Sequence, residues 1–115
     1  MLTYENPKII SKNEAEIIFS LKNEKDICNA LISIALYEED YKWTNDQLIK
    51  HLSEPIFNIN YASIVGLSHL SRRYPEIDVN KIKKAFNEMS NKKDLESVME
   101  DTLDDIFIFV TSKSK

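Results

Sequence analysis

Glycine and proline are scarce in this chain of 115 residues, which contains one glycine and three prolines. Sheet proteins use glycine repeatedly in their tight turns, so the scarcity argues against an all-β fold and favours helices joined by short polar loops. The length is that of one domain with a single core. We therefore expect residues 1–115 to form one all-α domain.

Cysteine and long apolar runs are also rare. Cys28 is the only cysteine, which excludes an internal disulfide framework and fits a reducing compartment. No uncharged stretch reaches transmembrane length, and "MLTYENPKII" reaches Pro7 before any long apolar run, unlike a leader. We therefore expect a cytoplasmic protein that does not associate with a membrane.

Residues suited to metal binding or catalysis are few. His51 and His69 are the only histidines, and together with Cys28 they fall in different expected helices without the paired spacing of zinc ligands. One glycine cannot build a phosphate-binding loop, and no serine or cysteine sits in a glycine-rich elbow. We therefore expect no metal, no cofactor and no enzymatic activity.

Charge is distributed unevenly. The net charge is −4, with residues 1–55 at about −4, residues 56–93 at about +4 and residues 94–115 at about −4. Binding of a nucleic-acid backbone requires many phosphates to be neutralised. The acidic ends therefore argue against direct binding of nucleic acid.

Apolar residues are arranged with helical spacing over most of the chain. Residues 1–12 contain Pro7 and show no sustained period, so we expect an extended arm there. From Asn13, apolar residues recur at the spacing of amphipathic helices. The pattern predicts helical repeats over residues 13–111, in six helices that are alternately short and long.

Capping residues mark several expected helix starts. Asn23 is expected to cap the second helix and Asp78 the fifth, and Asn91 or Lys92 opens the sixth. Thr44, with a glutamine three positions later, forms a capping box for the third helix. The preceding "YKW" is then a connector between the second and third helices.

The six helices form three short-then-long pairs with similar turns. Leu21, Leu52 and Met89 occupy the same place in the three units and are 31 and 37 residues apart. A helix-hairpin repeat of this length is typical of an α-solenoid, in which each pair buries its apolar face against the next. We expect a solenoid of three antiparallel helix hairpins.

The string "YASIVGLSHLSRRYPEID" within the expected fourth helix resembles the second helix of a HEAT-type repeat. Ala62, Gly66, Leu67 and Leu70 stand at positions where that pattern has small and apolar residues for close helix contact. The resemblance implies a HEAT-like fold.

With "MEDTLDDIFIF" some thirty residues later, the same string also resembles a group of small bacterial HEAT-like proteins. That group typically has a Gly-His-Leu-Ala-Arg-like string, matched here by residues 67–72, and an acidic Asp-Ala-Leu-Asp-Asp-Ile-like string, matched by residues 101–106. Ser68 and Ser71 depart from the pattern, since glycine and alanine are usual there. The resemblance covers roughly residues 55–110.

Members of this group look like immunity proteins of polymorphic or contact-dependent growth inhibition toxin systems. The resemblance implies that the chain binds and neutralises the C-terminal domain of a cognate toxin, often a nuclease. The implied partner is a basic protein, and the chain is expected to be a monomer that forms a heterodimer with the toxin.

The acidic stretch "MEDTLDDIF" has two interpretations. Like charges three or four residues apart weaken a helix by roughly 0.2–0.5 kcal/mol per pair, so these carboxylates need a cationic partner. In one interpretation Asp101 and Asp105 pair with Arg72 or Arg73 of the fourth helix. Likewise, Lys81 or Lys84 would pair with Glu100 or Asp104. In the other interpretation the carboxylates face a partner protein.

A second acidic cluster, "YEEDYKW", ends the expected second helix, with aromatic residues beside its carboxylates. Tyrosine and tryptophan are enriched at protein interfaces, although Trp43 could instead pack beneath the second and third helices. An acidic, aromatic surface would complement the basic cleft of a nuclease. The residues we expect to bind the partner are Glu38, Glu39, Asp40, Tyr41, Trp43, Tyr61, Glu100, Asp101 and Asp104.

Two other functions fit the expected fold. A non-enzymatic HEAT-like scaffold or adaptor would use the same solenoid surface for a different protein partner. A nucleic-acid enzyme is the third possibility, because HEAT-like alkylpurine DNA glycosylases share this architecture. Such an enzyme needs a basic concave groove, and here only residues 56–93 are basic.

Overall fold

The computed structural model describes residues 8–113, with side chains as far as residue 110. Within this range the chain forms six α-helices and one short 3₁₀ helix, and no strand. The elements are α1 (Lys12–Leu21), α2 (Glu24–Tyr37), α3 (Tyr41–His51), α4 (Phe57–Arg73), α5 (Val79–Glu88), η1 (Lys93–Leu95) and α6 (Glu96–Lys113).

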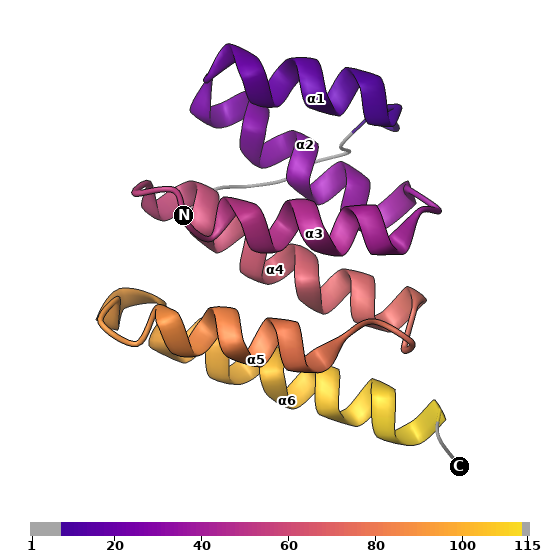
Figure 1. The fold of residues 1–115 in the computed structure, drawn as a ribbon, viewed down its shortest axis with the longest axis vertical. Coiled ribbons are helices and arrows are strands. Elements are labelled where there is room, and N and C mark those ends of the chain that lie inside the picture. The colour runs from indigo at the N-terminus through magenta and orange to yellow at the C-terminus, as the bar shows by residue number, and fades with distance from the viewer. Residues whose placement is uncertain (1–7, 114–115) are drawn as a thin grey trace.

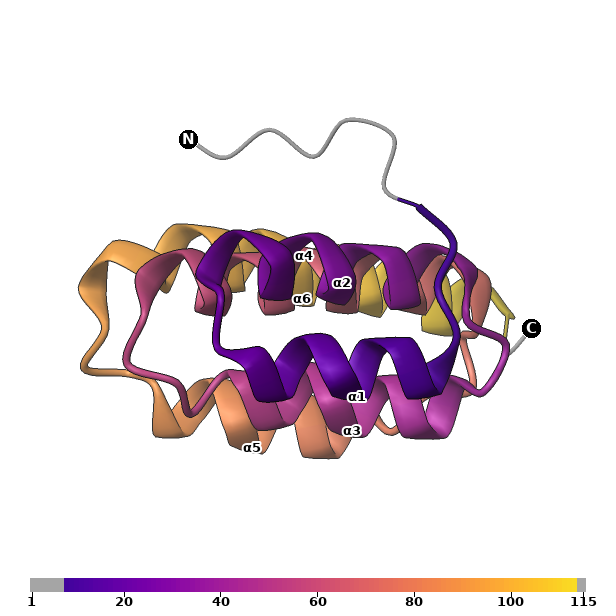
Figure 2. The ribbon, with the colours of Figure 1, turned by 90° about the horizontal axis from the view of Figure 1, so that it is seen from above.

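The helices pair into three antiparallel hairpins, α1–α2, α3–α4 and α5–α6, stacked along the longest axis (Figure 1). Helices α1, α3 and α5 form one layer, and α2, α4 and α6 form the other (Figure 2). The turns within the hairpins lie together at one end of the layers, and the α2–α3 and α4–α5 turns lie at the opposite end. The expected three-hairpin, HEAT-like, all-α fold is confirmed.

Several helices begin where the sequence predicts. The Asn23 side chain accepts from the backbone of Asp26 at the start of α2, and Asp78 accepts from the backbone of Lys81 at the start of α5. Helix α1 begins one residue earlier than expected, because Ser11 forms a complete capping box with a glutamate three residues later.

The start of α3 differs from the expectation. Asp40 is the N-cap, and its Oδ1 accepts from the backbone N–H of Trp43 at 3.1 Å. The connector predicted at "YKW" is therefore the first turn of α3. Thr44 is fully buried, and its hydroxyl donates to the carbonyl of Asp40 at 3.0 Å. Aspartate is as good a cap as threonine, so the helix begins at the earlier of the two candidates.

The start of the last helix also differs from the expectation, because a short 3₁₀ helix precedes it. The 3₁₀ helix η1 (Lys93–Leu95) follows Lys92, and α6 begins at Glu96. Leu95 is buried, so this short turn already contributes to the core. On α6, Met99 and Ile106 are buried, and Val98, Leu103 and Val110 are half-buried.

The core lies between the two layers. The one glycine, Gly66, lies where α4 packs closely on its neighbours, because a Cβ there would lie 2.9 Å from Leu48 Cδ2 and 3.4 Å from Ala35 Cβ. The expectation that Gly66 and Ala62 allow close helix contact is confirmed, since Ala62 is also fully buried.

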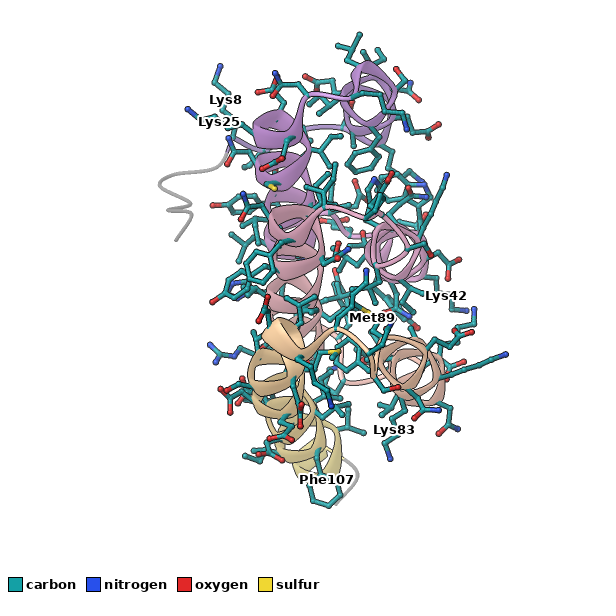
Figure 3. All side chains as sticks on the ribbon, turned by 90° about the vertical axis from the view of Figure 1, so that its left-hand side faces the viewer. Lys8, Lys25, Lys42, Lys83, Met89 and Phe107 are labelled. Atoms are coloured by element: carbon teal, nitrogen blue, oxygen red, sulfur yellow. The ribbon has the colours of Figure 1, made fainter. Side chains whose placement is uncertain are left out.

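The three equivalent positions of the repeat differ in burial. Leu52 and Met89 are buried, whereas Leu21 is 70% exposed. Figure 3 shows Met89 between the two layers, while Lys42 and Lys83 point outward from α3 and α5. Leu21 lies at the end of α1, in the first of the three described hairpins.

Asn60 connects the second and third hairpins and is only 2% exposed. Its Nδ2 donates to the carbonyls of His51, the last residue of α3, and of Leu52 and Glu54, which follow it, at 3.1, 3.3 and 2.9 Å. Its Oδ1 accepts from Lys92 Nζ at 3.0 Å. Carbonyls that the end of α3 leaves without helical partners are thereby satisfied.

Candidate partner-binding surfaces

The structure separates the predicted binding residues into three groups. Residues 38–43 lie at the α2–α3 turn, Tyr61 lies in the second turn of α4, and Glu100, Asp101 and Asp104 lie on α6. Helix α4 begins at the end of the layers opposite to the α2–α3 turn, and α6 belongs to the last hairpin (Figure 1). The nine residues therefore do not form one continuous patch.

At the α2–α3 turn, two of the three predicted carboxylates are engaged within the fold. Glu38 Oε2 accepts from the backbone N–H of Asp40 at 2.8 Å. Asp40 Oδ2 accepts from Lys12 Nζ at 2.8 Å. The Lys12 ammonium lowers the pKa of Asp40, with help from the backbone N–H of Trp43. Glu39 is exposed and has no side-chain partner among the described residues, so it is the carboxylate at this turn available to another protein.

The two aromatic residues after this turn are half-buried. Tyr41 stacks on Tyr74 with ring centroids 4.9 Å apart and packs against the core. Trp43 lies beneath the Lys12 ammonium, which is 5.9 Å from the ring centroid. Trp43 also lines a cavity of about 330 Å³ between α1 and α3. Both rings thus combine a packing role with partial exposure.

Tyr61 is half-buried against the core, with its ring centroid 6.1 Å from that of Phe57. Phe57 is 49% exposed in the first turn of α4, and sequence reasoning did not identify it as a surface residue. An apolar residue at a helix start gives no periodic signal that distinguishes a buried position from an exposed one.

The predicted pairing of α6 carboxylates with arginines of α4 is wrong. Arg72 lies over the Phe109 ring, 5.2 Å from its centroid. Arg73 Nη1 donates to the carbonyl of Ala35 at 2.8 Å, and its guanidinium lies 4.9 Å from the Tyr74 ring centroid. Neither arginine forms an ion pair with Asp101 within residues 8–110. The guanidinium groups instead contact an aromatic ring of α6 and a carbonyl of α2.

Asp105 is the one carboxylate of this stretch that faces the neighbouring helix. Its Oδ2 accepts from the Ser68 hydroxyl on α4 at 2.9 Å. Ser68 is the position where the resembled family usually has glycine, so this departure has a structural role here. Of the two interpretations, the contact within the fold applies to Asp105, but its partner is a hydroxyl rather than a guanidinium.

Glu100, Asp101 and Asp104 are exposed on α6 and have no side-chain hydrogen bond or ion pair among the described residues. Of the lysine partners proposed for this face, Lys81 Nζ lies 3.5 Å from Asp46 Oδ1 on α3, and Lys84 forms no ion pair within residues 8–110. The outer face of α6 therefore presents a row of carboxylates that the fold does not neutralise.

The two histidines occupy helix-packing positions. His69 is half-buried on α4, where burial, and then the nearby Arg72, lower its pKa. His51 is buried at the end of α3 and packs on Phe19, and burial lowers its pKa as well. Within the described residues, His, Cys, Asp and Glu side chains form no group of three that could hold a metal ion.

Other exposed apolar residues lie at the two ends of the stack and were not singled out from the sequence. Phe107 projects outward from α6 in the last hairpin (Figure 3). Ile17 and Leu21 are exposed on α1 in the first hairpin. No helix among the described residues is long and apolar enough to cross a membrane.

Comparison with solved structures gives a match over nearly the whole chain. The structure is similar to a chain in the crystal structure of a CDI complex from Cupriavidus taiwanensis LMG 19424, with a TM-score of 0.84 and 25% sequence identity. The match covers 97% of this chain and 99% of that chain. No protein-family model and no curated protein matches the sequence. The match confirms the resemblance to HEAT-like proteins of contact-dependent growth inhibition systems.

Proposed function

We propose that this chain is an immunity protein that binds and neutralises the C-terminal domain of a cognate bacterial toxin. The observation that carries the proposal is the end-to-end similarity to a chain of a CDI complex, at a TM-score of 0.84. The similarity covers both chains almost completely, so the two proteins share the whole domain rather than a single hairpin. The proposed complex is a heterodimer that forms in the cytoplasm, with residues 1–115 acting as one domain.

The exposed carboxylates of α6 support a basic partner. Glu100, Asp101 and Asp104 have no cationic partner among the described residues, and like charges at this spacing weaken the helix. A basic partner would neutralise them in the complex. Complementary charge also speeds association, because it steers the two surfaces together.

A nuclease is the kind of toxin that best fits this surface. A nuclease must present cationic side chains where it holds phosphates. An acidic protein that covers those side chains would exclude the substrate without any chemistry of its own. Inhibition would then need neither a cofactor nor a catalytic residue, in keeping with the role we propose for α6.

The α2–α3 turn would contribute a smaller acidic contact. Glu39 is exposed there, while Asp40 is held by Lys12 and by its capping role. Tyr41 and Trp43 beside it are partly exposed aromatic residues of the type enriched at interfaces. Because the turn and α6 are separated in the fold, a toxin that contacts both would extend along the stack.

Co-expression tests this proposal. The toxin domain encoded by the neighbouring gene is induced in cells with or without this chain, and growth is followed. We expect the chain to restore growth and to co-purify with the toxin domain. Growth arrest that persists despite a well-expressed, folded chain would overturn the immunity function and leave an adaptor role for the same solenoid surface.

A further inference from the structure

A cavity of about 330 Å³ lies between α1 and α3, next to the predicted residues of the α2–α3 turn. Phe19 on α1 and Trp43 and His51 on α3 supply aromatic rings to its lining. The rings of Phe19 and His51 are 4.4 Å apart at their centroids and tilted by 52°. The other six lining residues are polar or charged, so the cavity favours a ring-shaped occupant that also carries a polar group.

His51 supplies one defined polar group to this cavity. The residue is only 5% exposed, and its Nδ1 lies 2.8 Å from the carbonyl oxygen of Gln47. A carbonyl only accepts, so Nδ1 must carry the proton and Nε2 must present a lone pair. Nε2 has no hydrogen-bond partner among the described residues. A donor that enters the cavity can therefore bind to this nitrogen.

The charges around the cavity are balanced. Glu16 and Glu54 contribute two carboxylates, and Lys22 and Lys50 contribute two ammonium groups. A charged side chain of either sign would be attracted by two of these groups and repelled by the other two. The charge of the lining therefore favours neither a cationic nor an anionic occupant. A neutral group with a hydrogen-bond donor meets no such repulsion.

We propose that this cavity is a docking pocket for a tyrosine side chain of a protein partner. The phenol ring packs between Phe19 and Trp43, and the hydroxyl donates to His51 Nε2. Tyrosine combines an aromatic ring with one hydrogen-bond donor, and it is one of the residues that most often anchor protein interfaces.

This inference rests on the proposed function, because the partner that would supply the tyrosine is the toxin domain. The pocket opens beside Trp43, which belongs to the acidic, aromatic turn already assigned to the interface. It extends that interface from the α2–α3 turn along the groove between α1 and α3.

The pocket can be tested without the toxin, using p-cresol as a probe for the tyrosine side chain and toluene as its analogue without the hydroxyl. Trp43 is the only tryptophan and lines this cavity, so its fluorescence should respond to an occupant. We expect a saturable change with p-cresol and binding of toluene about tenfold weaker, the usual effect of one hydrogen bond. His51→Phe should abolish this difference, whereas His69→Phe, at the other histidine, should preserve it.

A measurement on the unmodified chain covers the case in which His51→Phe does not fold. The ¹⁵N resonance of His51 Nε2 should move on addition of p-cresol, while the resonances of His69 stay fixed. Non-saturable binding, equal affinity for toluene, or an unmoved His51 resonance would each overturn the proposal. If the toxin binds the chain equally well in saturating p-cresol, the pocket is not its docking site, and the immunity function stands independently.

Discussion

Lys92 Nζ lies 3.0 Å from Asn60 Oδ1, which links the beginning of η1 to the middle hairpin of the stack. The same ammonium lies 3.5 Å from the carbonyl of Leu52 and 3.4 Å from that of Glu54. Asn60 donates to these two carbonyls from the other side. One amide and one ammonium thus satisfy the polar groups where the α3–α4 turn meets the α5–α6 turn.

Asn60→Ala should destabilise the protein by about 2 kcal/mol, because it leaves buried carbonyls and Lys92 without their partner. Urea denaturation measures the change. Asn58→Ala is the matched control, since Asn58 on the same helix donates only to Glu24 at an exposed site. We expect the control to cost at most about 0.5 kcal/mol. Equal effects of the two substitutions would contradict the proposed role of Asn60.

The two histidines should both titrate below the ordinary pKa of 6.5, because burial disfavours their charged forms. The unfolded chain then takes up protons more readily than the folded one. Their contribution to the free energy of unfolding is present above pH 6.5 and is lost as the pH falls through the folded pKa values. Imidazole proton NMR gives both pKa values directly, and a value above 6.5 for either residue would be inconsistent with the packing described.

Cys28 should be almost unreactive in the folded protein. Burial, and then the charge of Glu24, raise the pKa of its thiol from 9.0 to about 11. At pH 8 this reduces the thiolate fraction by about a hundredfold, and burial of the side chain slows the reaction further. Iodoacetamide labelling with and without urea tests the prediction. Equal labelling rates in the two conditions would show that Cys28 is accessible.

The same thiol should make stability depend on pH under alkaline conditions. A raised pKa in the folded state means that the contribution of Cys28 is present below pH 9.0 and is lost as the pH rises toward about 11. Comparison of urea midpoints for the natural chain and Cys28→Ala isolates this contribution from that of the lysines. Parallel pH profiles for the two proteins would refute it.

The ion pair between Lys12 and Asp40 should be visible in the titration of Asp40. Lys12→Met is expected to raise the pKa of Asp40, because it removes the partner that lowers this pKa most. The pKa should stay below its ordinary value, since the backbone N–H of Trp43 still donates to the carboxylate. Carboxyl ¹³C NMR measures the shift. Lys81→Met, which breaks the other described ion pair, should leave Asp40 unchanged.

Much of the fold follows from local sequence signals. Caps at Asn23 and Asp78, apolar stripes at helical spacing, and similar turns in three short-then-long pairs were sufficient to predict three hairpins. The start of α3 was predicted wrongly because Asp40 and Thr44 are both good caps. Local pattern does not decide between two such candidates when the residues between them are compatible with a helix.

The candidate site was less predictable, because it depends on which side chains meet across helices. The sequence shows arginines on α4 and carboxylates on α6 at plausible spacing, yet Arg73 binds the carbonyl of Ala35 and Ser68 binds Asp105. These pairings follow from the relative rotation and offset of helices, which apolar spacing does not specify. The α1–α3 cavity is likewise a product of packing between hairpins.

Charge reversal separates the two acidic regions of the proposed interface. Glu100→Lys with Asp104→Lys should weaken toxin binding by roughly tenfold or more, mainly through slower association at low salt. Glu39→Lys should have a smaller effect, because a single carboxylate is exposed at that turn. Glu88→Lys on α5, which belongs to the other layer of the stack from α6, is the matched control. Association rates measured at two salt concentrations that do not differ among these variants would exclude the α6 surface.

The immunity function is tested most directly by calorimetric titration of the purified chain with the toxin domain encoded by the neighbouring gene. We predict one-to-one binding with a dissociation constant in the nanomolar range or below, on the order of 12 kcal/mol or more of binding free energy. Absence of binding between the two folded proteins at micromolar concentrations would contradict it.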